Sequence, residues 1–163
     1  MALKDALLAE FDHEMATTKK LLERIPEEKL TWRPHERSRS LGALAQHLAQ
    51  LPDWGSLSLD LRAVDLASVP PTPADPASRS AILKLFDETR AKTRKALDKT
   101  DAELGGMWSL KREGQEIFSM PTVAAFRSFV LSHVVHHRGQ LSVYLRLNDI
   151  PVPAIYGPSA DEG

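Results

Sequence analysis

The sequence of 163 residues contains no cysteine and no excess of charge of either sign. Without thiols the chain cannot form disulfides, thiolate nucleophiles, iron-sulfur clusters or thiolate-ligated zinc, so any metal must be bound by His, Asp or Glu. Lys and Arg total 21 against 22 Asp and Glu, a balance that argues against binding to nucleic acid or to an anionic membrane. No apolar run reaches the length of a signal peptide or a membrane span, so we expect a cytoplasmic protein.

Length and composition fit one domain. A chain of this length usually forms a single unit, and 42% hydrophobic residues supply enough apolar surface for one core. We therefore expect one domain over residues 1–163.

Apolar residues recur at three- and four-residue spacing along four segments, which predicts four helices with one buried face each. The first spans residues 2–25 and ends at Pro26. The second follows an N-cap at Ser38 or Ser40 and runs from residue 41 into the sixties, with a kink caused by Pro52 one turn beyond His47.

The third predicted helix begins after Ser78 or Ser80 and includes Leu97. The fourth begins at Pro121 and continues through Leu147, before Asn148 and the prolines that follow. Residues 67–78 are rich in proline and predict a long extended crossover. Residues 108–120 indicate a short hairpin-like excursion or an irregular loop. Because no strand pair is convincing, the predicted fold is all-α, a four-helix bundle with a long crossover connection.

Two histidines of the fourth predicted helix are separated by four residues. His133 and His137 therefore project from one helical face, about 5 to 6 Å apart at the β-carbon. That face is largely apolar, and an unpaired buried imidazole would cost about 1 to 3 kcal/mol. The pair alone is equally compatible with metal binding and with core histidines satisfied by carbonyls or water.

A third histidine favours the metal. His47 lies on the apolar stripe of the second predicted helix, with Leu44, Leu51 and Trp54, so its ring can meet the other two across the bundle. Neutral imidazole is the commonest metal ligand in proteins. We therefore predict one divalent ion bound by His47, His133 and His137. The remaining histidines are expected to be surface residues or, for His136, to point away from this face: His13, His35 and His136.

Two segments resemble a known family. The segment HVVHHRGQLSVYLRLNDIPVPAIYGPSADE, residues 133–162, resembles the last helix and tail of the DinB-like family, and SLGALAQHLAQ places His47 where that family has its upstream histidine. The resemblance implies a four-helix bundle, often a homodimer, with a three-histidine site for nickel or zinc. Some relatives in the wider superfamily are transferases or isomerases that use low-molecular-weight bacterial thiols, and many members have no established reaction. A small-molecule substrate, such as a bacterial thiol, is the implied partner.

The predicted site suggests a reaction class but no catalytic residue. Three neutral ligands leave the ion its full charge, and the inward faces of the second and fourth helices carry no Asp or Glu near the histidines. The missing base favours a metal-activated nucleophile, most concretely a thiol transferred to an electrophile, with a metal-dependent hydrolase as the alternative. A non-enzymatic metal- or ligand-binding stress protein and a plain interaction bundle are the other hypotheses.

The sequence leaves open the roles of three neighbouring residues on the fourth predicted helix: Arg138, Gly139 and Gln140. Gln140 lies on the histidine face, where it can bond a metal-bound water or fill a polar gap, and we favour the structural role. Gly139 would allow a close helix contact. Arg138 is expected to form an ordinary salt bridge, with the tail or with a carboxylate such as Asp161.

Overall fold

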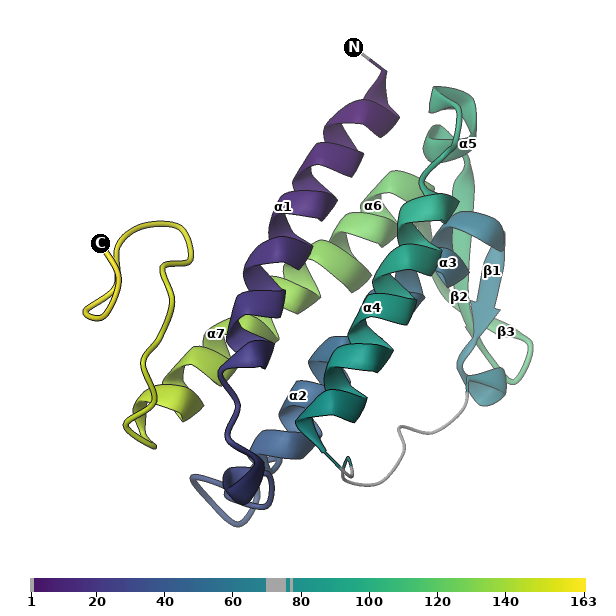
Figure 1. Ribbon diagram of the computed structural model, residues 1–163. Helices are drawn as coiled ribbons and strands as arrows, with labels where there is room; N and C mark the ends of the chain where they lie inside the picture. The colour runs from purple at the N-terminus through teal and green to yellow at the C-terminus, as the bar shows by residue number, and fades with distance from the viewer. Residues whose placement is uncertain (1, 70–75, 77) are drawn as a thin grey trace.

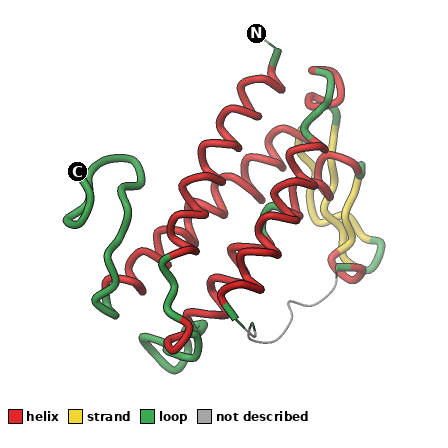
Figure 2. The backbone as a smooth tube through the Cα atoms, in the orientation of Figure 1, coloured by secondary structure: helices red, strands yellow, loops and turns green. Residues whose placement is uncertain are grey.

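The computed structural model describes residues 2–69, 76 and 78–163, so most of the expected crossover at residues 67–78 lies outside the described residues. The chain is mostly helical, with a small sheet (Figures 1 and 2). The longer helices are α1 (Leu3–Glu23), α2 (Leu41–Gln50), α3 (Asp53–Asp60), α4 (Arg79–Ala96) and α7 (His133–Arg146). The shorter helical segments are η1 (Glu27–Lys29), η2 (Leu66–Ser68), α5 (Asp101–Gly105), α6 (Thr122–Phe126) and the π-helical η3 (Arg127–Ser132).

One apolar core lies between the long helices. Helix α1 packs against α4 and α7, and α2 packs against α4 and α7. Each helix contributes its periodic apolar face, as the three- and four-residue spacing predicts. Fully buried members of this core include Leu7, Phe11, Met15, Leu44, Leu48, Phe86, Phe126, Val130, Val134 and Leu141. Within the described residues, no helix is long and apolar enough to cross a membrane.

Pro52 divides the second predicted helix into α2 and α3 rather than only bending it. A proline cannot donate a backbone hydrogen bond, so the ladder of helical hydrogen bonds is interrupted here and side chains from a neighbouring helix can bond to carbonyl groups at the break. Helix α4 supplies two: the hydroxyl of Thr89 donates to the carbonyl of Ala49 at 2.7 Å, and the hydroxyl of Thr93 donates to the carbonyl of Pro52. The break is thus stabilised by a neighbouring helix, and it leaves His47 in an uninterrupted helix.

Serine caps start two of the helices. The side chain of Ser40 accepts from the backbone N–H of Ala43, and that of Ser78 accepts from the backbone N–H of Ala81. Each cap satisfies a donor that the first helical turn leaves without a partner. Ser40 and Ser78 are therefore the caps among the candidates that the sequence offered.

The prediction of an all-α bundle is wrong in one respect, because the structure contains a three-stranded sheet in the order β1-β2-β3. Strand β1 (Ala63–Asp65) pairs in parallel with β2 (Met107–Arg112), and β2 pairs in antiparallel with β3 (Gln115–Pro121). Figure 1 shows the sheet beside α3 and α6. The hairpin-like interpretation of residues 108–120 is the one that the structure supports.

The carboxylate of Asp65 holds the sheet together at the hairpin turn. It accepts hydrogen bonds from the backbone N–H groups of Glu113 and Gly114 at 3.0 and 2.6 Å, and from that of Ala67 at 2.9 Å. These bonds lower the pKa of Asp65, with the one from Ala67 as the largest cause. Strand β1 thereby fixes a turn in which Gly114 has a left-handed φ of 80°.

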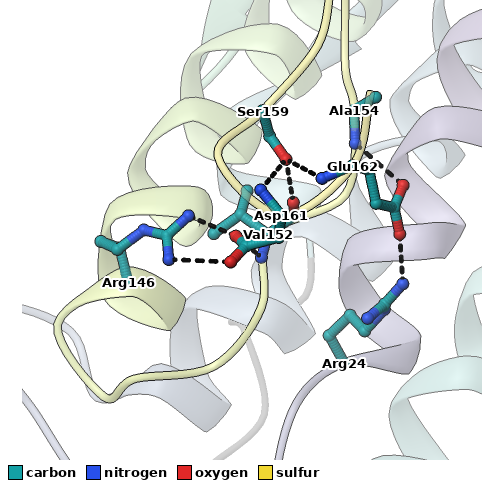
Figure 3. A network of polar contacts seen from close by, with 7 residues as sticks. All are labelled: Arg24, Arg146, Val152, Ala154, Ser159, Asp161 and Glu162. Carbon is teal, nitrogen blue, oxygen red and sulfur yellow. Dashed lines mark hydrogen bonds and ion pairs between the residues drawn. The ribbon is translucent and has the colours of Figure 1, made fainter.

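The C-terminal tail, residues 150–163, lies on the side of the helices away from the sheet (Figure 1). Figure 3 shows its two ion pairs, Arg146 with Asp161 and Arg24 with Glu162, which attach the tail to α7 and to the end of α1. Inside the tail, the hydroxyl of Ser159 donates to the carbonyl of Val152 at 2.7 Å. The tail is therefore an ordered loop laid against the helices.

Candidate metal centre

The structure brings His47, His133 and His137 together at the contact between α2 and α7. Nε2 of His137 lies 3.1 Å from Nε2 of His47 and 3.0 Å from Nε2 of His133. One nitrogen from each of the three rings can be chosen so that all lie within 4.8 Å of one another. Each residue is half-buried, so the cluster is at the edge of the core with access to solvent.

The elements around the cluster explain this convergence. Helix α2 packs on α7. Leu44 and Leu48 of α2 are buried on either side of His47, so His47 lies on the side of α2 that faces α7. His133 is the first residue of α7 and follows directly on the π-helical segment. A π-helical turn inserts an extra residue into the helical repeat and is often found at functional sites. The π-helical turn changes which side of the helix the residues before His133 face, compared with a regular α-helix. His133 and His137 lie after it and keep their four-residue spacing on one face.

All three rings have lowered pKa values. Burial is the largest cause in each case. For His47 burial, together with the nearby His137, Arg39 and His133, lowers the pKa from 6.5 to about 4. The rings are therefore neutral at pH 7, which is the state in which imidazole binds a metal.

Gln140 fixes the tautomer of one ring. Its Oε1 lies 2.7 Å from Nδ1 of His137. Because an amide oxygen only accepts hydrogen bonds, Nδ1 of His137 must carry the ring proton. Nε2 of the same ring then has a free lone pair directed at the other two histidines. A hydrogen bond to the outer nitrogen of a metal-binding histidine is the usual way in which proteins orient such a ring.

Hydrogen bonds alone cannot satisfy this cluster. Nε2 of His137 has one lone pair and accepts one hydrogen bond, yet both His47 and His133 approach it to about 3 Å. One of the two N···N contacts would therefore remain unfavourable if the rings were neutral. A proton or a cation among the three nitrogens removes the conflict, and the lowered pKa values disfavour the proton.

Two of the three nitrogen-nitrogen spacings are close to those of a metal site, and all three are at most 4.8 Å. Zinc binds histidine at about 2.0 to 2.1 Å, which places tetrahedral ligands about 3.3 Å apart. The contacts of 3.0 and 3.1 Å differ from this by a few tenths of an ångström. The three side chains thus fit a divalent ion, and three protein ligands would leave a coordination position for a small molecule.

The other histidines lie outside the cluster, as the sequence predicts. His13, His35 and His136 are exposed. The ring of His136 lies 4.8 Å from that of His137, centroid to centroid, and its charge contributes to the lowered pKa of His137. His136 therefore influences the cluster without being one of its three nitrogen donors.

Arg138 forms a salt bridge, but with a partner other than Asp161. Its guanidinium is buried and lies 2.6 Å from the carboxylate of Glu14 on α1. The hydroxyl of Tyr156, in the tail, donates to the same carboxylate at 2.9 Å, while Asp161 pairs with Arg146. Arg138 thus joins α7, α1 and the tail.

Two residues near the cluster have features that the sequence did not predict. Gly139 makes no close contact with another helix, because a β-carbon at this position would have no atom within 4 Å outside its own stretch of helix backbone. Arg39, for which the sequence made no prediction, carries a charge that lowers the pKa of all three clustered rings. No sequence signal identified Arg39, because its position depends on the path of the loop before α2.

Comparison with known proteins gives consistent results. The family model described as the DinB family matches residues 1–163. The uncharacterized protein YrdA of Bacillus subtilis is 26% identical over 160 residues, which cover 97% of this chain and 90% of that protein.

Solved structures show the same fold. A DinB-like protein from Bacillus cereus has a TM-score of 0.75 and 22% identity, covering 93% of this chain and 97% of the other. The DinB-like protein YjoA from Bacillus subtilis has a TM-score of 0.72 and 18% identity, covering 93% and 99%. With a family model matched over its whole length, the chain belongs to the DinB family.

Proposed function

We propose that this protein binds one divalent metal ion, nickel or zinc, through His47, His133 and His137 and uses it to activate a small molecule. The observation that carries the proposal is the approach of two imidazoles to the single lone pair on Nε2 of His137, whose proton is held on the other nitrogen by Gln140. A divalent ion bound there would act as a Lewis acid that favours loss of a proton from a thiol or a water molecule. Family membership and the histidine cluster both support a metal.

The proposed reaction is transfer of a small thiol to an electrophile. No carboxylate is among the charged groups that shift the pKa of the three rings in the described part of the chain. A thiol has an ordinary pKa of about 8.5, so it needs less help from a general base than water, with a pKa of about 15.7. In the transfer the thiol loses its proton to solvent, its sulfur bonds to the electrophilic atom, and the leaving group departs with its electron pair.

Metal content tests the first part of the proposal. The untagged protein should be purified, exposed to zinc or nickel, desalted and measured by mass spectrometry. We expect about one ion per chain, and loss of that ion in His47→Ala and in His137→Ala. His136→Ala is the matched control, because it removes an exposed imidazole from the same helix and should leave the metal content unchanged. A wild-type chain that stays metal-free would contradict the proposal.

A second assay separates enzyme from metal carrier. Conjugation of a small thiol with an aromatic electrophile should proceed faster with the metal-loaded protein than with the His137→Ala variant. The wild type should carry the metal, and both proteins should be folded. If the metal-loaded wild type then accelerates neither conjugation nor ester hydrolysis, the ion would have a structural or binding role, and the enzymatic part of the proposal would fail.

A further inference from the structure

Helix α7 buries one charged side chain in its contact with α1. The buried residues of α7 are Val134, Arg138, Leu141 and Leu145, which recur at the three- and four-residue spacing of a single helical face. Arg138 is only 1% exposed. Burial of a charge is costly unless the charge is paired and hydrogen-bonded, and an apolar residue would fill the stripe without that cost. Packing alone therefore does not explain an arginine at this position.

The guanidinium of Arg138 bonds to one turn of α1. It lies 2.6 Å from the carboxylate of Glu14, and its Nη1 donates to the backbone carbonyl of Glu14 at 3.1 Å and to the hydroxyl of Thr18 at 3.3 Å. Glu14 and Thr18 are four residues apart, on the same face of α1. Because the guanidinium is a planar fork with fixed donor directions, these acceptors together define one orientation of Arg138.

Tyr156 completes the network from the C-terminal tail. Its hydroxyl accepts a hydrogen bond from Nη2 of Arg138 and donates one to the carboxylate of Glu14 at 2.9 Å. The tail is also attached to α7 and to the end of α1 by the ion pairs of Asp161 and Glu162 (Figure 3). The Glu14–Arg138–Tyr156 network thus fixes α7 against two other segments of the chain.

The rotation of α7 about its axis decides where its histidines lie. His137 directly precedes Arg138, so the two side chains leave the helix about 100° apart and turn together when the helix turns. A ring nitrogen lies roughly 6 Å from the helix axis, and a rotation of about 10° would therefore move it by about 1 Å. Distances between a metal and its ligands vary by only about 0.2 Å. Because His47 belongs to α2, a small rotation of α7 would spoil the meeting of the three rings.

We propose that the Glu14–Arg138–Tyr156 network positions the metal centre. It fixes the rotation of α7 against α1, and so sets where the two histidines of α7 meet His47. This inference rests on the proposed function, since it requires a metal at the three histidines. The three members of the network are positioning residues in this account, because none of them supplies one of the three nitrogens.

The test compares zinc affinity with stability. Arg138→Met combined with Glu14→Leu replaces the buried ion pair by apolar side chains, a change that often preserves or raises stability. The metal-free double variant should unfold at about the temperature of the metal-free wild type. Its zinc affinity, measured by competition with a chromogenic chelator, should be about tenfold lower or more, since groups that orient metal ligands commonly contribute about 10- to 100-fold. A role in stability alone would leave the affinity unchanged.

A second variant decides the matter if the double variant folds poorly. Arg138→Lys keeps the charge beside Glu14, but an ammonium group lacks the planar fork that fixes the orientation. Its zinc affinity should be about three- to tenfold lower, which is the usual contribution of one hydrogen bond. The control is Arg127→Gln combined with Glu10→Gln, which removes an exposed ion pair between α1 and the segment before α7 and should leave the affinity unchanged.

The outcomes separate this inference from the proposed function. Wild-type zinc affinity in the folded double variant or in Arg138→Lys would overturn the inference and leave the metal site intact. Failure of the wild type to bind zinc would overturn the inference and the proposed function together.

Discussion

Replacing Gln140 tests how the chain prepares its histidines for a metal. In Gln140→Ala, the acceptor 2.7 Å from Nδ1 of His137 is lost, so the ring is free to rotate or to place its proton on Nε2. Removing such an outer hydrogen bond commonly reduces metal affinity by about 10- to 100-fold. Because Gln140 is exposed and water can replace its oxygen, we expect the lower end, about tenfold or 1.4 kcal/mol.

The assay is competition for zinc with a chromogenic chelator. Gln140→Glu is the informative companion, because a carboxylate keeps the acceptor and makes the ring more basic, so affinity should match or exceed that of the wild type. Ser142→Ala is the control, since its hydroxyl donates within α7 to the carbonyl of Gly139. If Gln140→Ala bound zinc as tightly as the wild type, the tautomer argument would be refuted.

Four further perturbations have definite expected results. In the metal-free protein the free energy of unfolding should fall as the pH is lowered from about 6.5 towards 4. The reason is that His47 takes up a proton near pH 6.5 in the unfolded chain and only near pH 4 in the folded protein. Chemical denaturation at several pH values should show a shallower decline in His47→Leu. Arg138→Ala leaves the buried carboxylate of Glu14 without its cation and should cost about 3 to 5 kcal/mol in thermal unfolding, with much of this recovered when Glu14 is also replaced by Met. Gly114→Ala should cost about 1 to 2 kcal/mol because φ is 80°, whereas Gly139→Ala, in a helix with open space around it, should stabilise the protein by about 0.5 to 1 kcal/mol.

The helices were predictable because each carries a long periodic stripe. Leu7, Phe11 and Met15 of α1 recur at four-residue spacing and are all fully buried. The same regularity placed His47 on one stripe and His133 with His137 on another, and stripes that share a core must meet. Their convergence followed from the pattern, and binding of an ion by them stays a prediction.

A hairpin at residues 108–120 was one of two interpretations of the sequence, but the three-stranded sheet was not predicted, for two physical reasons. Strand β1 has three residues and pairs in parallel with a strand more than 40 residues later, so no local pattern marks it. Strand β3 is exposed along almost its whole length, so it lacks the alternation of buried and exposed residues that identifies a half-buried strand.

The surroundings of the metal centre depend on three-dimensional details. Gln140 was placed on the correct face, but its bond to Nδ1 of His137 requires a particular orientation of that ring. The partner of Arg138 proved to be Glu14, which is 124 residues earlier in the chain. Such long-range pairs are decided by how helices pack, and single-sequence patterns do not encode them.

X-ray absorption spectroscopy of the zinc- or nickel-loaded protein tests the central claim most directly. The account predicts three imidazole nitrogens at about 2.0 to 2.1 Å from the ion, with one fewer in each of His47→Ala, His133→Ala and His137→Ala where metal is still retained. A spectrum without multiple imidazole ligands, or one unchanged by these substitutions, would show that the ion lies elsewhere and that the three-histidine centre is not the metal site.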